Sequence, residues 1–176
     1  MVAFPIHAWA IVLYLNDIGW IVERNNVWDA IGVGAYGLVI AFVESIFIFL
    51  IATALGFLIA KYWDEDTRVN AMGTIILITS IWAILNQLYF LAEPPRAEAL
   101  VHLLMKTAHP LRDLYLGALA FGALSTGLPV FAILKFQKAS QLAGALFERL
   151  SWLTVFYFLL DVVSLGIVIA RNIQGA

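Results

Sequence analysis

The chain lacks cysteine altogether and has few charged residues. None of its 176 residues is a cysteine, which excludes disulfides, thiolate nucleophiles and zinc or iron–sulfur sites held by cysteine. Charged residues make up 12% of the chain, whereas a soluble domain averages about a quarter. The 10 basic and 12 acidic residues leave a net charge of −2, with no basic stripe for nucleic acid and no polybasic run for anionic lipid. We therefore expect no nucleic-acid partner.

Hydrophobic residues dominate instead, at 63% of the chain, and the mean hydropathy is +0.93. Five stretches approach the ~20 apolar residues that a transmembrane helix needs. We expect one all-α integral membrane domain over residues 1–176, a bundle of four to five transmembrane helices with one short amphipathic surface helix. Its surroundings would be the lipid bilayer of a prokaryotic plasma membrane. The predicted spans are residues 4–22, 36–60, 71–91, 111–134 and 150–170.

Polar and glycine-rich segments set the predicted ends of these spans. Residues 4–22 are barely long enough to cross the bilayer, and Asn16 and Asp17 lie in their second half, so an interfacial helix is the alternative. Three glycines within residues 30–37 predict a loop or interfacial turn before the second span. Residues 61–70 (KYWDEDTRVN) form the most polar stretch and predict an exposed loop.

Residues 95–107 predict a short amphipathic helix. Pro95 suits the first turn of a helix, and Arg96, Glu98 and Lys106 fall mostly on the side opposite the apolar residues. The segment is too short to span the bilayer. We expect it to lie on the membrane surface or to pack against one end of the bundle.

Two acidic residues lie near the middle of apolar spans, Glu44 and Asp161. A carboxylate at this depth costs at least a few kcal/mol, so it faces protein, a partner or water rather than lipid. Both are candidates for proton transfer or quinone contact, and Asp17 is a weaker one. The alternative is a hydrogen-bonded acid that fixes the helix register or contacts a partner subunit. We predict that Glu44 and Asp161 point into helix–helix or subunit contacts.

The positions of the three histidines indicate that the chain does not bind haem. His7, His102 and His109 lie at or outside the ends of predicted spans, whereas a membrane b-type haem normally needs histidines within them. Glu98 and His102 are one helical turn apart, as are His109 and Asp113, which makes His102 and His109 weak candidates for a metal site. Such spacing is also common by chance. We expect neither haem nor metal in this chain, and leave open a quinone or lipid at its surface.

One stripe of small residues predicts close helix packing. Ala118, Gly122 and Thr126 repeat every four residues in the fourth predicted span, which places them on one helix face. Small residues in this pattern let two helix backbones approach closely. We predict that this face is buried against another helix.

Two segments resemble parts of known membrane enzymes. The stretch FPIHAWAIVLY (residues 4–14), followed by further spans, resembles the opening of the membrane region of lipoteichoic-acid-synthase-type sulfatase-fold enzymes. The globular catalytic domain of that family has no counterpart among these residues. Residues 106–131 followed by 149–171 resemble the later helices of polysulfide-reductase-type quinone-linked membrane subunits. Neither resemblance includes a defining motif, so no residue role is carried over.

No recognisable catalytic constellation remains. The serines have no neighbouring base or strained turn that would activate a nucleophile. We expect an accessory or anchoring subunit of a larger membrane complex, not catalytic on its own and in contact with other membrane subunits. One alternative is a quinone-contacting or proton-handling subunit of a respiratory membrane complex. A second is a small oligomeric transporter or channel whose acids line a path.

Overall fold

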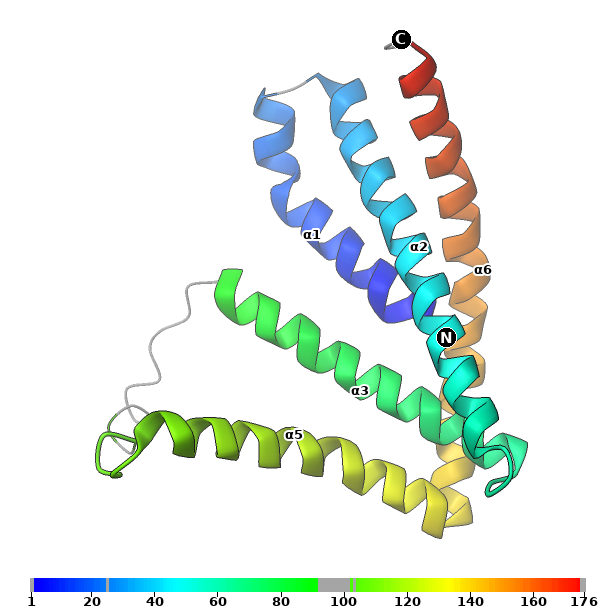
Figure 1. Ribbon diagram of the computed structural model, residues 1–176. Helices are drawn as coiled ribbons and strands as arrows, with labels where there is room; N and C mark the ends of the chain where they lie inside the picture. Colours follow the sequence, from blue (N-terminus) through cyan, green and yellow to red (C-terminus); the bar gives the residue numbers. More distant parts are fainter. Residues whose placement is uncertain (1, 25, 92–101, 103, 175–176) are drawn as a thin grey trace.

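The computed structural model describes residues 2–24, 26–91, 102 and 104–174 (Figure 1). Within these residues the chain forms helices and no strand. Five of the helices are long and apolar enough, by length and composition, to cross a membrane. This confirms the predicted all-α class and suggests a multi-pass membrane protein. The five helices are α1 (Ala3–Arg24), α2 (Val27–Ile59), α3 (Glu65–Leu91), α5 (Pro110–Lys135) and α6 (Gln137–Gln174).

The second helix begins earlier than predicted. Asn26 caps α2, because its side-chain oxygen accepts a hydrogen bond from the backbone N–H of Asp29 at 2.9 Å. The loop predicted within residues 30–37 is therefore wrong, since these residues are helical. Their glycines mark close contact with other helices rather than a turn: Gly32 is buried, and Gly34 lies against the ring of Tyr14.

Two polar segments are also more helical than predicted. The exposed loop predicted at residues 61–70 ends at Asp64, whose carboxylate accepts a hydrogen bond from the backbone N–H of Thr67 at 3.0 Å and caps α3. This hydrogen bond lowers the pKa of the exposed Asp64 carboxyl below its usual value, so the cap is charged at neutral pH. At the other end of the chain, α6 continues without a break from polar residues 137–149 into the predicted fifth span.

The segment between α3 and α5 contains the predicted surface helix. Residues 92–101 and 103 lie outside the described part of the chain, and they include most of the predicted helix at 95–107. After this segment, α5 begins at Pro110, one residue before the predicted start of the fourth span. The proline occupies the first turn, where its missing N–H is not needed.

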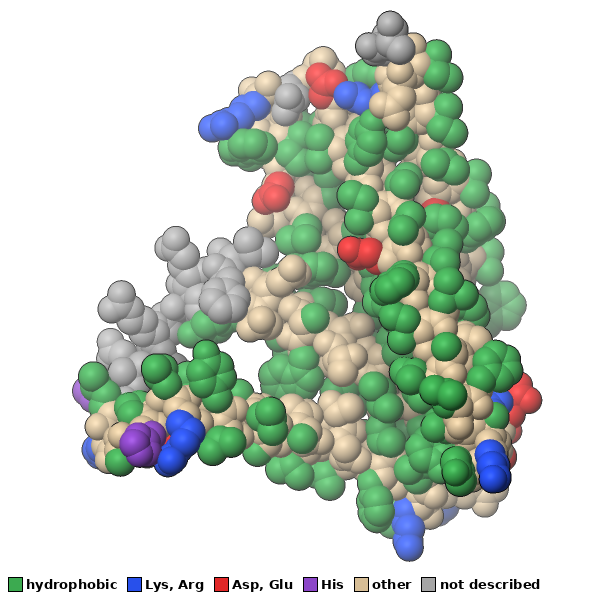
Figure 2. All heavy atoms as spheres, in the orientation of Figure 1, with side chains coloured by type: hydrophobic (Ala, Val, Ile, Leu, Met, Phe, Trp, Pro, Cys, Tyr) green, Lys and Arg blue, Asp and Glu red, His purple; other side chains and the backbone are tan. Residues whose placement is uncertain are grey.

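The helices form two groups that share α6 (Figure 1). Helices α1 and α2 pack along α6, whereas α3 and α5 lie side by side and extend away from α1 and α2. The long α6 contacts members of both groups. Hydrophobic side chains spread over the surface of both groups, and Lys and Arg side chains gather near helix ends (Figure 2). Such an apolar surface can face lipid, because lipid tails are as apolar as these side chains.

Hydrogen bonds connect α2 and α3 to the two ends of α6. Near the C-terminus, Arg171 donates hydrogen bonds to the carbonyl oxygen of Trp28 at 2.6 Å and to the carboxylate of Asp29 at 2.7 Å. At the other end of α6, the Asn70 amide of α3 donates to the backbone oxygen and to Oγ of Ser140, both at 3.0 Å. These contacts tie α2 and α3 to opposite ends of α6.

Gly32 makes room for the Arg171 contact, and this gives a testable prediction. A Cβ atom at position 32 would lie 2.5 Å from Cζ of Arg171, so Gly32→Ala should displace the guanidinium from Trp28 and Asp29. We expect the free energy of unfolding in detergent to fall by roughly 1 kcal/mol, as for a partly exposed ion pair. Gly37→Ala is the matched control, because no atom lies within 4 Å of its added Cβ. It should raise stability by roughly 0.5–1 kcal/mol through helix propensity. Equal effects of the two changes would show that the contacts of Arg171 with Trp28 and Asp29 do not stabilise the fold.

Helix α5 packs on α3 through a row beside the predicted small-residue stripe. Trp82 of α3 donates to Oγ of Ser125 at 3.0 Å and meets the ring of Phe121 edge-on at 5.0 Å between centroids. In the stripe itself, Ala118 is exposed, and no atom lies within 4 Å of a Cβ built on Gly122. Within the described chain the stripe Ala118–Gly122–Thr126 is therefore not a close helix contact. Its burial against another chain stays a prediction.

Candidate functional site: a buried histidine–aspartate pair

The most enclosed polar contact joins the first and last helices. His7 on α1 is fully buried, and Asp161 on α6 is 5% exposed. Nε2 of His7 lies 2.9 Å and 3.1 Å from the two carboxylate oxygens of Asp161. This contact brings together residues that are 154 positions apart in the chain. It fixes how α1 lies along α6.

The other ring nitrogen of His7 determines where its proton lies. Nδ1 is 2.8 Å from the carbonyl oxygen of Ala3, which can only accept a hydrogen bond, so Nδ1 carries a hydrogen. Nε2 then either donates to a charged Asp161 or accepts from a protonated one. In both cases one proton lies in the hydrogen bond between the two side chains, and the pair as a whole is neutral. This neutrality allows the pair to sit among apolar helices.

Only one side of the pair faces open space. The ring of Tyr157 stacks on His7 at 5.0 Å between centroids, and His7 does not line either cavity found among the described residues. Asp161 lines a cavity of about 510 Å³ between α1, α2, α3 and α6. A ligand in the cavity can therefore reach the carboxylate but not the imidazole.

A second cavity gathers the other polar residues of the spans. It has a volume of about 650 Å³ and is bordered by Asp17 of α1, Glu44 of α2 and Gln87 of α3. Asp17 accepts a hydrogen bond from the Asn16 amide at 2.9 Å. Glu44 is exposed and forms no hydrogen bond or ion pair with any residue that the structure describes. Among the described residues that line it, the cavity thus holds two carboxylates and no basic residue.

The predicted acids have different outcomes. Asp161 points into a helix–helix contact, which confirms its predicted placement. Glu44 is exposed on the single chain and is not in a helix–helix contact among the described residues, so only the predicted subunit contact stays a prediction for it. His7 was missed as the partner of Asp161, since the sequence predicted only that it lay at a span end. Two signals pointed to it: Asp161 needs a polar partner, and His7 alone among the three histidines falls within a predicted span, residues 4–22.

The weak metal candidates are not brought together with other ligands. His102 and His109 are both exposed. Among the residues that the structure places, no three His, Asp or Glu side chains lie close enough to hold a metal ion.

Comparison with protein-family models, curated proteins and solved structures finds no match for this chain. The function must therefore be inferred from the two cavities, the buried pair and the unpaired glutamate.

Proposed function

We propose that this chain is an accessory or anchoring subunit of a larger complex in a prokaryotic plasma membrane and is not catalytic on its own. Glu44 carries this proposal. It lies in the middle of α2, the most apolar of the five helices, and it is exposed without a partner in the described chain. Lipid cannot solvate a carboxylate at this depth, so another chain supplies its polar contact.

The shape of the molecule supports the same proposal. The chain exposes 12512 Å², whereas a compact monomer of 19.5 kDa exposes roughly 8,500 Å². The excess reflects the separation of α3 and α5 from α1 and α2 (Figure 1). A protein–protein interface takes about 800 Å² from each partner, so there is surface for more than one neighbouring subunit.

In this proposal the buried pair is a structural clasp. Breaking a buried ion pair by removing one partner is strongly unfavourable, so His7 and Asp161 specify how α1 lies on α6. The clasp and the contacts of Arg171 lie at different heights on α6. Together they hold α1 and α2 in fixed register, which suits an anchor on which other subunits assemble.

A second candidate function is proton handling beside a quinone or a similar ligand. The observation that favours it is that Asp161 is hydrogen-bonded to His7 and also borders a cavity. Ionisable residues inside membrane spans often mark proton relays. In this candidate Asp161 passes the shared proton to a molecule in the cavity and later takes one back, while His7 keeps the hydrogen on Nδ1 that it donates to Ala3.

Turnover of the assembled complex separates the two candidates. Asp161→Asn keeps the shape of the side chain but removes its ability to titrate, and Glu44→Gln does the same in the second cavity. For an accessory subunit we expect both variants to keep turnover within about threefold of the wild type once the complex is assembled. The yield of complex is measured alongside as the control. A loss beyond about tenfold, equal to ~1.4 kcal/mol of activation barrier, in intact complex would overturn the accessory role in favour of proton handling.

A further inference from the structure

The cavity beside Asp161 is long and almost wholly apolar. Along α2 its wall runs from Phe42 to Phe57, a length of ~22 Å at 1.5 Å per residue. One leaflet of a bilayer, headgroup region included, is also roughly 20–22 Å deep. The volume of about 510 Å³ lies within the roughly 300–1,000 Å³ of ligand sites. These dimensions fit a single extended hydrocarbon chain.

The two charged side chains that line this cavity lie at its opposite ends. Asp161 and the first residues of α1 border the inner end, and Arg68 of α3 borders the outer end near the α2–α3 connection. That connection carries Tyr62 and Trp63, and aromatic residues of this kind gather at membrane–water interfaces. The outer end is therefore at headgroup depth.

The guanidinium of Arg68 is available to bind a ligand. It is only partly exposed, and it forms no hydrogen bond or ion pair within the described part of the chain. By contrast, Arg171 and Arg112 each contact an aspartate. A guanidinium presents a planar fork of donors that matches the oxygens of a phosphate group. The mouth of the apolar cavity is thus suited to a phosphate.

Acidic residues next to Arg68 determine which lipid headgroup charge is favoured. Three exposed acids lie within four residues of it, Asp64, Glu65 and Asp66. Arg68 is close enough to Asp64 to contribute to the lowering of its pKa. A purely anionic headgroup would meet these three carboxylates. A zwitterionic headgroup places its phosphate at Arg68 and its ammonium at the acids, so each of its two charges meets a group of opposite sign.

We propose that this cavity is a binding site for one zwitterionic phospholipid, with an acyl chain between α2 and α3 and the phosphate on Arg68. The chain would run inward along Phe49 and Met72 and end near Asp161. The lipid would fill the space between the two groups of helices and join them as a structural component. The site does not depend on Glu44 or on any other subunit.

The test counts lipids that stay bound to the purified protein. The chain is reconstituted into nanodiscs of phosphatidylethanolamine and phosphatidylglycerol in equal amounts, transferred to detergent, and examined by native mass spectrometry. We expect one retained phosphatidylethanolamine per chain. Ala52→Phe should reduce retention to background, because Ala52 lines the cavity and the added ring fills it. Ala54→Phe, at an exposed position of the same helix outside the cavity, should retain the lipid.

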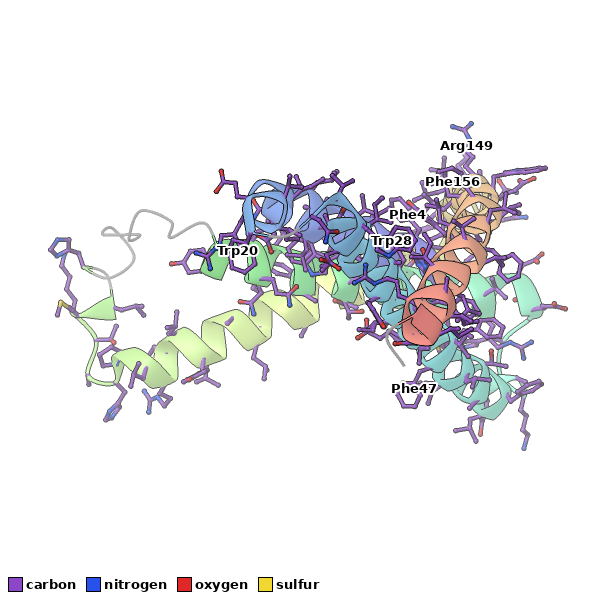
Figure 3. The ribbon with its side chains drawn as sticks, turned by 90° about the horizontal axis from the view of Figure 1, so that it is seen from above. Phe4, Trp20, Trp28, Phe47, Arg149 and Phe156 are labelled. Carbon is purple, nitrogen blue, oxygen red and sulfur yellow. The ribbon has the colours of Figure 1, made fainter. Side chains whose placement is uncertain are left out.

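A second pair of variants tests the headgroup and leaves the cavity volume nearly unchanged. Arg68→Gln should lower retention of phosphatidylethanolamine about tenfold, because glutamine cannot form the charge-assisted hydrogen bonds of a guanidinium with a phosphate. Arg149→Gln is the control, because Arg149 projects outward from α6, away from the cavity (Figure 3). Equal retention by Ala52→Phe and Ala54→Phe, preferred retention of phosphatidylglycerol, or no effect of Arg68→Gln would each overturn the proposal.

Discussion

Replacing His7 with leucine should lower the free energy of unfolding by about 3–5 kcal/mol, the range for removing one partner of a buried pair of ionisable residues. His7 is fully buried and Asp161 is 5% exposed. Without the imidazole, Asp161 would keep no polar partner deep between α1 and α6. Thermal or denaturant-induced unfolding of the purified protein in detergent measures the effect.

The matched control is Asp161→Asn. Nδ1 of His7 still donates to the carbonyl oxygen of Ala3, so Nε2 can accept a hydrogen bond from the new amide. We expect a loss of only ~1 kcal/mol, typical of one exchanged hydrogen bond. Replacing His7 and Asp161 together with leucine should recover much of the stability lost in His7→Leu, because a buried ion pair can be exchanged for apolar residues at little cost. If His7→Leu is no worse than Asp161→Asn, the pair does not hold α1 to α6.

The second large effect is expected from Glu44→Leu, in the assembly of the complex. If a partner subunit supplies a polar group to Glu44, leucine leaves that group buried and unsatisfied, at a cost of about 1–3 kcal/mol. We expect the fraction of this chain recovered in assembled complex to fall by roughly 5- to 150-fold. Size-exclusion chromatography of the solubilised complex measures this fraction.

Phe47→Leu is the matched control for Glu44→Leu. Phe47 lies three residues after Glu44, on the same side of α2, is 63% exposed and points away from the other helices (Figure 3). Its replacement removes apolar contact but no hydrogen bond, so assembly should be nearly unchanged. If Glu44 faced lipid instead, Glu44→Leu would stabilise the chain by roughly 2.5–3.5 kcal/mol, because a costly polar group would be gone from hydrocarbon. A more stable chain with undiminished assembly would contradict the subunit proposal.

The arrangement of spans could be predicted from hydropathy, but the helix ends could not. Apolar runs close to the thickness of a bilayer identify all five helices. The start of α2 was placed too late because its glycines were interpreted as loop residues, whereas Gly32 and Gly34 meet Arg171 and Tyr14 from other helices. Local pattern does not distinguish a glycine that breaks a helix from one that lets a neighbour approach.

The sequence predicted the burial of Asp161 but not its partner His7, because the partner depends on how the helices pack. An acid in an apolar span must find a polar partner, so the burial of Asp161 followed from its position in the sequence. Which residue meets it depends on the packing of α1 on α6, and no periodicity within either helix carries that information. Arg68 gives no sequence signal at all, since it lies in a polar stretch and becomes notable only where the cavity opens beside it.

The central claim, that the chain works as a subunit of a larger complex, is tested most directly by its mass in the native membrane. Native membranes are solubilised with a nanodisc-forming polymer, and the particle that contains this chain is examined by native mass spectrometry. We predict a mass that includes at least one different polypeptide in addition to the 19.5-kDa chain. A single chain, or a particle built only from copies of this chain as in a small oligomeric transporter, would contradict the account.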